Sequence, residues 1–127
     1  MENRSNVLIV EDEEIVLEIF TRILGKHYNV FSCTTVTEFE QYKTENEISL
    51  FVIDLSLGDE KDGIQLIKEL RDSSRYANSP VVVVTAHAFN QDERTAMKAG
   101  ANKFLRKPVE NDLLLMTVKE LLEKSAV

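Results

Sequence analysis

The chain has little of what disulfide-bonded, membrane-spanning or nucleic-acid-binding proteins require. Its 127 residues include one cysteine, Cys33, so no disulfide can form within the chain. No apolar run approaches the roughly 20 residues of a membrane-spanning helix, and the N-terminus lacks the apolar segment of a secretory signal. Acidic residues outnumber basic ones by 22 to 15 without any basic block. We therefore expect a cytoplasmic protein that binds neither membrane nor nucleic acid.

Histidine, proline and glycine are also scarce. The two histidines, His27 and His87, have no cysteine or histidine at the spacing of a zinc site. Two prolines and four glycines leave no repeat, linker or low-complexity stretch. A content of 43% hydrophobic and 29% charged residues is ordinary for a globular protein. The length suits one domain, which we expect to span residues 1–127.

Five short apolar runs alternate with five stretches of helical periodicity. The runs are rich in Val and Ile, which indicates strands buried on both faces of a sheet. Short connections and right-handed crossovers then predict an α/β fold with a doubly wound, five-stranded parallel sheet and five helices. We expect strands at 7–10, 28–31, 50–54, 81–84 and 102–105, and helices at 15–24, 35–43, 64–71, 90–99 and 113–122, the second and third capped by Thr35 and Asp62.

Reactive side chains follow four of these strands. Glu11 and Asp12 come after the first strand, Asp54 after the third, Thr85 after the fourth and Lys107 after the fifth. The carboxyl ends of parallel strands meet at one edge of a sheet, so these groups should lie together. Three carboxylates in one place repel one another unless a cation neutralises them. Oxygen-only ligands with room for water fit Mg²⁺ better than zinc.

The same set has the parts of a phosphoryl-transfer site. A carboxylate such as Asp54 can attack phosphorus and carry an aspartyl phosphate. The metal, the ammonium of Lys107 and the hydroxyl of Thr85 would stabilise the phosphoryl oxygens. Taken singly, an Asp after a strand or a Lys before a proline is usually a loop cap or a solvated side chain. The combination at the ends of consecutive strands is what supports the hypothesis.

This ordered set resembles the receiver domain of two-component response regulators, in a stand-alone form like that of chemotaxis regulators. The resemblance extends from Val7 to the last helix and implies a flavodoxin-like fold with strand order 2-1-3-4-5. It implies that Asp54 accepts a phosphoryl group from a phosphohistidine on a sensor histidine kinase or a histidine phosphotransfer protein. The residues that carry the resemblance are Glu11-Asp12, Asp54, Thr85, Phe104 and Lys107-Pro108.

The resemblance also assigns roles around the acceptor. Asp12, Asp54 and the backbone carbonyl of Ser56 would bind Mg²⁺, and Glu11 would help through water. Lys107 would pair with the phosphoryl group, aimed inward by a cis bond to Pro108, and Thr85 would hydrogen-bond the group. Such a domain is not an enzyme in the turnover sense, because it catalyses only its own phosphorylation and slow autodephosphorylation.

The output of a receiver is a changed protein-binding surface. In this family Thr85 moves toward the phosphoryl group and Phe104 fills the space that Thr85 leaves, although Phe104 could equally be a core aromatic. A downstream protein target, or a second copy in a weak dimer, would bind the face formed by the helix at 90–99, the strand at 102–105 and the last helix. Ser56 and His87 occupy variable positions that tune dephosphorylation. We hypothesise that His87 shields the site, the alternative being a solvent-facing loop residue.

Several alternatives stay open or are disfavoured. A haloacid-dehalogenase-like phosphatase would need an Asp where Ser56 stands, and a flavin carrier would need a phosphate loop where four acids follow the first strand. A phosphorylation-independent binding module with the receiver fold is the serious competitor.

Gly58 stands where many receivers have proline, in a loop at 57–63 that is one residue longer than the commonest form. Apolar residues of the first helix could dock a kinase if exposed, but we expect most of Ile15, Val16 and Ile19 to be buried.

Overall fold

The structure, a computed structural model, describes residues 4–86 and 89–125 and contains one parallel sheet with strand order β2-β1-β3-β4-β5. This order confirms the predicted α/β doubly wound topology. The elements are β1 (Asn6–Val10), α1 (Glu14–Gly25), β2 (Asn29–Cys33), α2 (Val36–Glu45), β3 (Leu50–Ile53), α3 (Gly63–Asp72), β4 (Val81–Thr85), α4 (Asn90–Ala99), β5 (Lys103–Arg106) and α5 (Asn111–Ser125).

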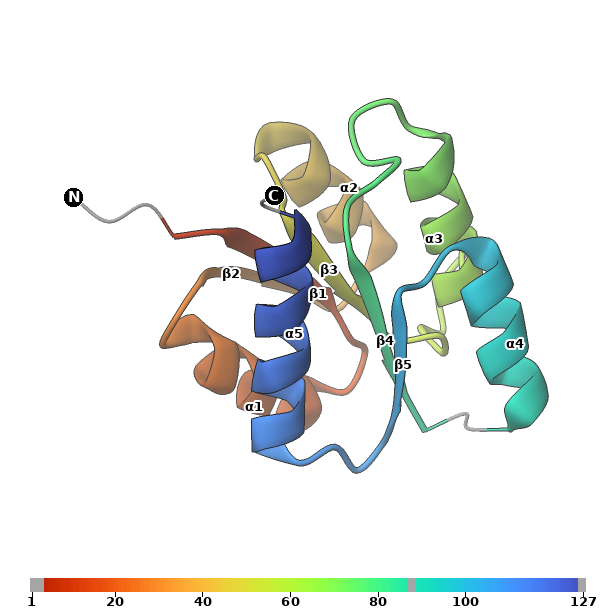
Figure 1. Cartoon of the computed structure of the whole chain (residues 1–127). Coiled ribbons are helices and arrows are strands. Elements are labelled where there is room, and N and C mark those ends of the chain that lie inside the picture. The colour runs from red at the N-terminus through yellow and green to blue at the C-terminus, as the bar shows by residue number, and fades with distance from the viewer. Residues whose placement is uncertain (1–3, 87–88, 126–127) are drawn as a thin grey trace.

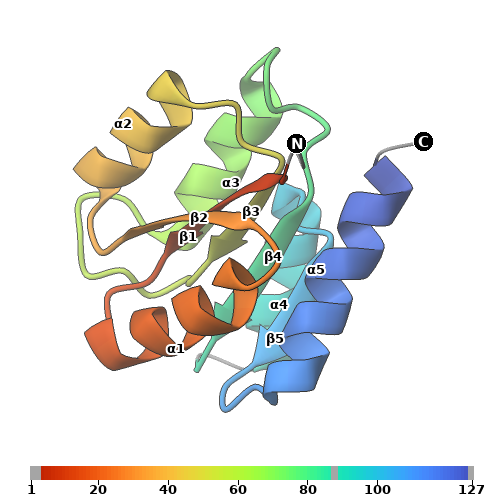
Figure 2. The ribbon, with the colours of Figure 1, turned by 90° about the vertical axis from the view of Figure 1, so that its left-hand side faces the viewer.

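Helices cover both faces of the sheet, with α1 and α5 on one face and α2, α3 and α4 on the other (Figure 1; Figure 2). Alternate residues of a strand point to opposite faces, so each continuous apolar run contributes side chains to a hydrophobic core on both faces of the sheet. In β1, Leu8 and Val10 join the core under α2, α3 and α4, whereas Val7 and Ile9 join the core under α1 and α5. Among the described residues, no helix is long and apolar enough to cross a membrane.

The boundaries of β2 differ from the prediction. The strand runs from Asn29 to Cys33 rather than over 28–31, because Tyr28 still donates a backbone hydrogen bond of 2.9 Å to Leu24 at the end of α1. At its carboxyl end, β2 pairs Cys33 with Val10 of β1.

Burial raises the pKa of the Cys33 thiol to about 12, so the nucleophilic thiolate is disfavoured at neutral pH.

The helix caps follow the sequence closely. The hydroxyl of Thr35 accepts a hydrogen bond of 3.2 Å from the backbone N–H of Glu38, as expected for the start of α2. The carboxylate of Asp62 accepts one of 2.9 Å from the N–H of Gln65, whose side-chain oxygen accepts one of 2.9 Å from the N–H of Asp62. A complete capping box therefore begins α3.

The apolar stripe of α1 is wider than the arc of the helix that is buried. The helix turns Phe20 and Leu24 into the core, with Val16 partly buried beside them. Because Ile15 and Ile19 lie to one side of that arc, 75% of Ile15 and 44% of Ile19 remain exposed. The expectation that most of Ile15, Val16 and Ile19 would be buried is therefore wrong.

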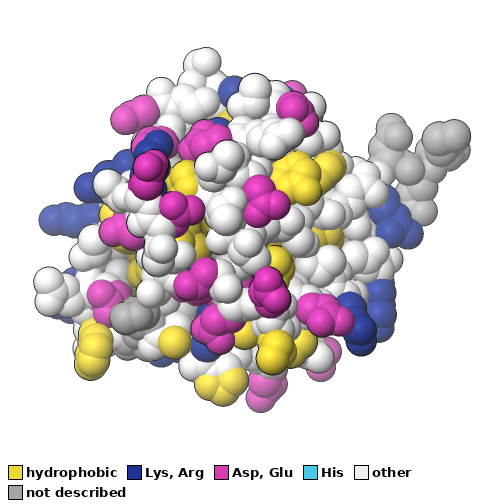
Figure 3. Space-filling view, turned by 180° about the vertical axis from the view of Figure 1, so that it is seen from behind, with side chains coloured by type: hydrophobic (Ala, Val, Ile, Leu, Met, Phe, Trp, Pro, Cys, Tyr) yellow, Lys and Arg dark blue, Asp and Glu magenta, His cyan; other side chains and the backbone are white. Residues whose placement is uncertain are grey.

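Charge is distributed unevenly around the sheet. Residues 36–72, from the start of α2 to the end of α3, hold ten acidic and four basic side chains, so this segment carries most of the chain's formal net charge of −7. Seen from behind, Asp and Glu side chains are spread over much of the visible face, and Lys and Arg side chains lie mainly at its margins (Figure 3). The remaining segments are nearly balanced in charge.

Candidate functional site

The predicted reactive residues meet at the carboxyl edge of the sheet, the lower edge in Figure 1. The backbone N–H of Asp54 donates a hydrogen bond of 3.1 Å to the carbonyl of Val10, which continues the pairing of β1 and β3 past the strand ends. On the other side of β1, the N–H of Glu11 donates to the carbonyl of Cys33 at 3.1 Å. The sheet therefore fixes the backbones of Glu11 and Asp54 beside each other, and both side chains are almost fully buried.

Lys107 reaches these carboxylates from β5. Its Nζ lies 2.7 Å from Oε1 of Glu11 and donates a hydrogen bond of 3.2 Å to Oδ2 of Asp54. A third carboxylate oxygen, Oε1 of Glu13, lies 3.4 Å from Nζ. The backbone N–H of Lys107 donates to the carbonyl of Thr85 at 3.0 Å, and the Lys107–Pro108 peptide bond is cis, as the resemblance implies.

Burial and mutual repulsion shift the protonation of this cluster. Desolvation, reinforced by the nearby Asp54 and opposed by Lys107, raises the pKa of Glu11 to about 7. Desolvation lowers the pKa of Lys107, but the carboxylates of Glu11 and Asp54 outweigh it, so the pKa of this ammonium is raised overall. Lys107 thus stays charged, while the carboxylates beside it carry more negative charge than one ammonium neutralises.

The acidic residues are close enough to hold a cation. Ligand oxygens from Glu11, Asp12, Glu13 and Asp54 all lie within 4.8 Å of one another. Oε1 of Glu11 is buried, and despite its ion pair with Lys107 it accepts no hydrogen bond from the described residues. Oxygen-only donors, some buried and some open to solvent, fit a hard divalent cation that keeps part of its water shell. The cluster therefore suits Mg²⁺.

A cavity of about 130 Å³ gives access to the cluster, lined by Asp12, Glu13, Asp54, Ser56, Ala86 and Lys107. The backbone N–H of Ser56 donates a hydrogen bond of 3.1 Å to Oδ1 of Asp54 and so orients the carboxylate.

Glu13 also lines this cavity, and it is the site residue that was not predicted from the sequence. The signal available for it was the unbroken acidic run from Glu11 to Glu14.

The two residues expected to form the switch lie on the neighbouring strands β4 and β5. Thr85 ends β4 with no exposed surface, and Phe104 of β5 is half-buried against the core on the side of α2, α3 and α4. The guanidinium carbon of Arg106 lies 5.6 Å from the centre of the Phe104 ring. His87, the expected tuning residue, lies outside the described residues.

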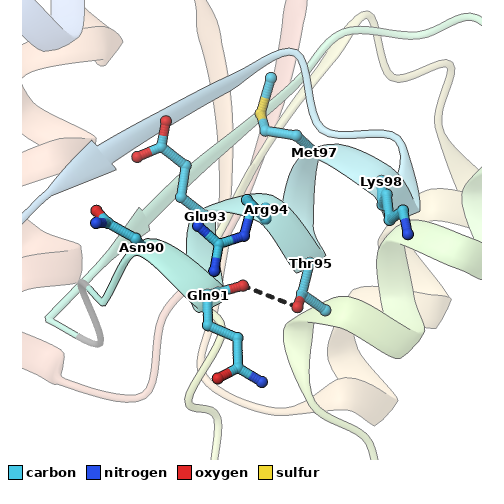
Figure 4. Close-up of a pocket in the computed structure, with 7 residues that line it drawn as sticks. All are labelled: Asn90, Gln91, Glu93, Arg94, Thr95, Met97 and Lys98. Carbon is cyan, nitrogen blue, oxygen red and sulfur yellow. Dashed lines mark hydrogen bonds between the residues drawn. The ribbon is translucent and has the colours of Figure 1, made fainter.

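A larger hollow of about 780 Å³ lies along α4 and includes no residue of the acidic cluster (Figure 4). All the residues that line it come from this one helix, and the charged ones are of both signs: Glu93, Arg94 and Lys98. Thr95 donates its hydroxyl to the carbonyl of Gln91 at 2.8 Å, a bond within the helix. No set of polar groups from several elements converges here, so the hollow does not compete with the acidic cluster as a site of chemistry.

Comparisons with known proteins agree on one family. The sequence model of one protein family, the response regulator receiver domain, matches residues 7–119. The transcriptional regulatory protein GltR of Pseudomonas aeruginosa is 31% identical over 124 residues, which are 97% of this chain and 51% of that protein. The polar-differentiation response regulator DivK of Brucella ovis is 27% identical over 118 residues, 92% of this chain and 95% of that protein. The chain thus spans about half the length of GltR and nearly the whole of DivK.

Solved structures give the same fold. A CheY-like response regulator receiver domain protein from Methanospirillum hungatei superposes with a TM-score of 0.87 at 24% identity, covering 96% of each chain. The BeF3-activated DrrB receiver domain superposes with a TM-score of 0.87 at 21% identity, covering 95% of this chain and 99% of that one. At these identities the likeness supports the architecture, and the chemistry has to be argued from the side chains.

Proposed function

Because the chain belongs to the receiver domain family of two-component response regulators, we propose that Asp54 is its phosphoacceptor. The donor is a phosphohistidine on a sensor histidine kinase or a histidine phosphotransfer protein. The observation that carries the proposal is the buried Asp54 carboxylate, held by Lys107 Nζ at 3.2 Å and by the Ser56 N–H at 3.1 Å in a cavity open to solvent. We propose that residues 1–127 form one receiver domain.

The residues of the chain support an in-line transfer. A carboxylate oxygen of Asp54 forms a bond to phosphorus while the bond between phosphorus and the donor imidazole nitrogen breaks, and that nitrogen keeps the electron pair. The Ser56 N–H fixes the orientation of the carboxylate before the attack. Lys107 then moves its ammonium from the carboxylates to a phosphoryl oxygen, and the Thr85 hydroxyl donates to another. Hydrolysis by water reverses the modification slowly, with Ser56 and His87 as tuning positions.

We propose Mg²⁺ as the cofactor, held by Asp12, Asp54 and the backbone carbonyl of Ser56, with Glu11 acting through water. The support is the set of ligand oxygens within 4.8 Å and the excess of carboxylates over ammonium groups around them. When bound, the ion neutralises the carboxylates and the charge that develops on the phosphoryl oxygens. Burial raises the pKa of Glu11 to about 7, and a nearby cation would favour the ionised form of this carboxylate.

The signal would leave through the face of α4, β5 and α5. Thr85 and Phe104 lie on the neighbouring strands β4 and β5, and Phe104 packs against the core in the present state. Movement of Thr85 toward the phosphoryl group would let Phe104 turn inward and alter this face. A downstream protein would bind the altered face in the cytoplasm, and the chain would act as a monomer or weak dimer rather than as a turnover enzyme.

The test is the intact mass of the protein after incubation with acetyl phosphate and Mg²⁺. We expect a gain of one phosphoryl group that disappears when Mg²⁺ is chelated and in the Asp54→Ala variant. Circular dichroism of both proteins shows that each is folded. No gain in folded wild-type protein, repeated with purified histidine kinases as donors, would contradict the proposal and favour a phosphorylation-independent binding module.

A further inference from the structure

Glu13 has no part in the transfer described above, yet its side chain lies in the site. Its Oε1 is 3.4 Å from Nζ of Lys107, and 60% of the side chain is exposed. We propose that Glu13 is a specificity-determining residue that competes with the phosphoryl group for Lys107 and slows the capture of small anionic phosphoryl donors. This inference rests on the proposed function and concerns the access of the donor to Asp54.

Lys107 already contacts several carboxylates with which a phosphoryl group has to compete. An ammonium group has three N–H donors. In the part of the chain that the structure describes, three carboxylates approach Nζ: Glu11 at 2.7 Å, Asp54 at 3.2 Å and Glu13 at 3.4 Å. Two of these contacts, those to Asp54 and Glu13, are hydrogen bonds, and a phosphoryl oxygen competes with them for Nζ. Glu13 makes the longest contact, and its side chain is 60% exposed against 2% for Glu11 and 4% for Asp54, so Glu13 is the one that leaves.

Glu13 also lies where an incoming donor has to pass. Of the residues that line the cavity, Asp54 is buried, whereas Asp12 and Glu13 are exposed. Asp12 is assigned to the cation, and Glu13, whose contact with Lys107 is the longest of the three, remains an exposed carboxylate at the mouth. A donor that carries negative charge is repelled there, and the repulsion grows with the charge of the donor.

The local structure of α1 gives independent support. Glu13 occupies the N-cap position of α1, yet its side chain makes no capping hydrogen bond within the described residues. The caps of α2 and α3, Thr35 and Asp62, both accept such a bond. Ser, Thr, Asp or Asn would cap α1 better than Glu. A local choice that does not favour the helix, and that places a carboxylate beside Lys107, is typical of a functional position.

The experiment compares Glu13→Gln with wild type in three measurements. They are the rate of phosphorylation by acetyl phosphate and by the less anionic phosphoramidate at saturating Mg²⁺, the Kd for Mg²⁺ by calorimetry, and the affinity for beryllofluoride by fluorine NMR. We expect the rate with acetyl phosphate to rise about two- to fivefold at low salt, with a smaller gain for phosphoramidate and at high salt. Beryllofluoride should bind more tightly, while the Kd for Mg²⁺ changes less than about threefold.

Glu14→Gln is the matched control, since Glu14 is exposed, lies next to Glu13 in the first turn of α1 and does not belong to the acidic cluster. An equal gain in this control would show an effect of net charge alone and overturn the proposal. So would unchanged rates in Glu13→Gln, or a tenfold weaker Kd for Mg²⁺, which would make Glu13 a metal ligand. Should wild-type protein accept no phosphoryl group, the proposed function fails, but the beryllofluoride affinities still decide the role of Glu13.

Discussion

Asp54 depends on a glycine that packs directly behind it. The backbone N–H of Gly63 donates a hydrogen bond of 3.0 Å to the carbonyl of Leu55, which draws the first turn of α3 onto the end of β3. A Cβ atom at Gly63 would collide with the backbone carbonyl oxygen of Asp54 and with Cα of Leu55. Both obstacles are backbone atoms, which cannot rotate away as a flexible side chain can.

We therefore expect Gly63→Ala to lower the free energy of unfolding by about 1–3 kcal/mol. The displacement of Asp54 should also slow phosphorylation in the mass assay. Gly25→Ala is the control, because a Cβ at this helical position meets nothing within 4 Å. It should leave stability unchanged or raise it by about 0.4–1 kcal/mol. Urea unfolding followed by circular dichroism measures both, and equal stabilities of the two variants would contradict the packing argument.

The long loop between β3 and α3 is fastened to α2. Gly58 has a φ of 61°, a conformation that glycine adopts without strain, and the loop then turns Asp59 toward the start of α2. Oδ2 of Asp59 accepts a hydrogen bond of 2.9 Å from the N–H of Val36, and Oδ1 accepts one of 2.7 Å from the N–H of Glu60. The loop that follows Asp54 is thereby linked to a helix that packs on β1.

This link predicts a pH dependence. The two backbone N–H groups lower the pKa of Asp59 below its ordinary value of 3.8. A carboxyl group whose pKa is lowered by folding stabilises the fold above its unfolded pKa, and that contribution is lost as pH falls through the folded pKa. We expect the amide proton of Val36 to shift in NMR spectra with a midpoint below pH 3.8 and to stay constant in Asp59→Asn. A midpoint at or above the ordinary value would show that the link does not form.

One arginine joins the end of α3 to the elements that lead into the output face. Arg71 donates to the carbonyl of Gly100 at 3.1 and 2.7 Å, to those of Tyr76 and Ser79 at 3.1 and 2.8 Å, and to Oδ1 of Asn102 at 3.1 Å. The planar guanidinium reaches all four groups at once. An ammonium cannot, because its three donors leave a single nitrogen atom.

We expect Arg71→Lys to lower the free energy of unfolding by about 2–3 kcal/mol, because half-buried carbonyl groups lose charged hydrogen bonds. Arg22→Lys is the control, since Arg22 forms an ion pair with Glu18 on the surface of α1 and 78% of its side chain is exposed. This second variant should stay within about 0.5 kcal/mol of wild type. Thermal unfolding of both variants measures the difference, and similar losses would show that the fork of Arg71 has no special role.

The whole architecture could be predicted because it follows from few rules. Buried parallel strands read as continuous apolar runs, and short right-handed connections then predict a doubly wound sheet, whereas its order 2-1-3-4-5 came from the resemblance to receiver domains. The same order places Glu11, Asp54 and Lys107 at one edge, so their proximity followed from topology alone. Contacts that depend on the direction of a side chain were not predictable. Glu13 meets Lys107 from a distant part of the sequence, and Ile15 is exposed because the buried arc of α1 is narrower than its apolar stripe.

The uneven charge of the molecule has a consequence for its encounters in solution. With most of the formal negative charge on residues 36–72, from α2 to α3, the domain is an electric dipole whose negative end lies toward this segment. Such a dipole rotates an approaching partner before contact and raises the fraction of collisions that are productive, an effect that salt weakens. A partner with a basic flank beside its phosphohistidine would be oriented by this field as it approaches the domain. Charged residues far from Asp54 would then influence the rate of productive encounters.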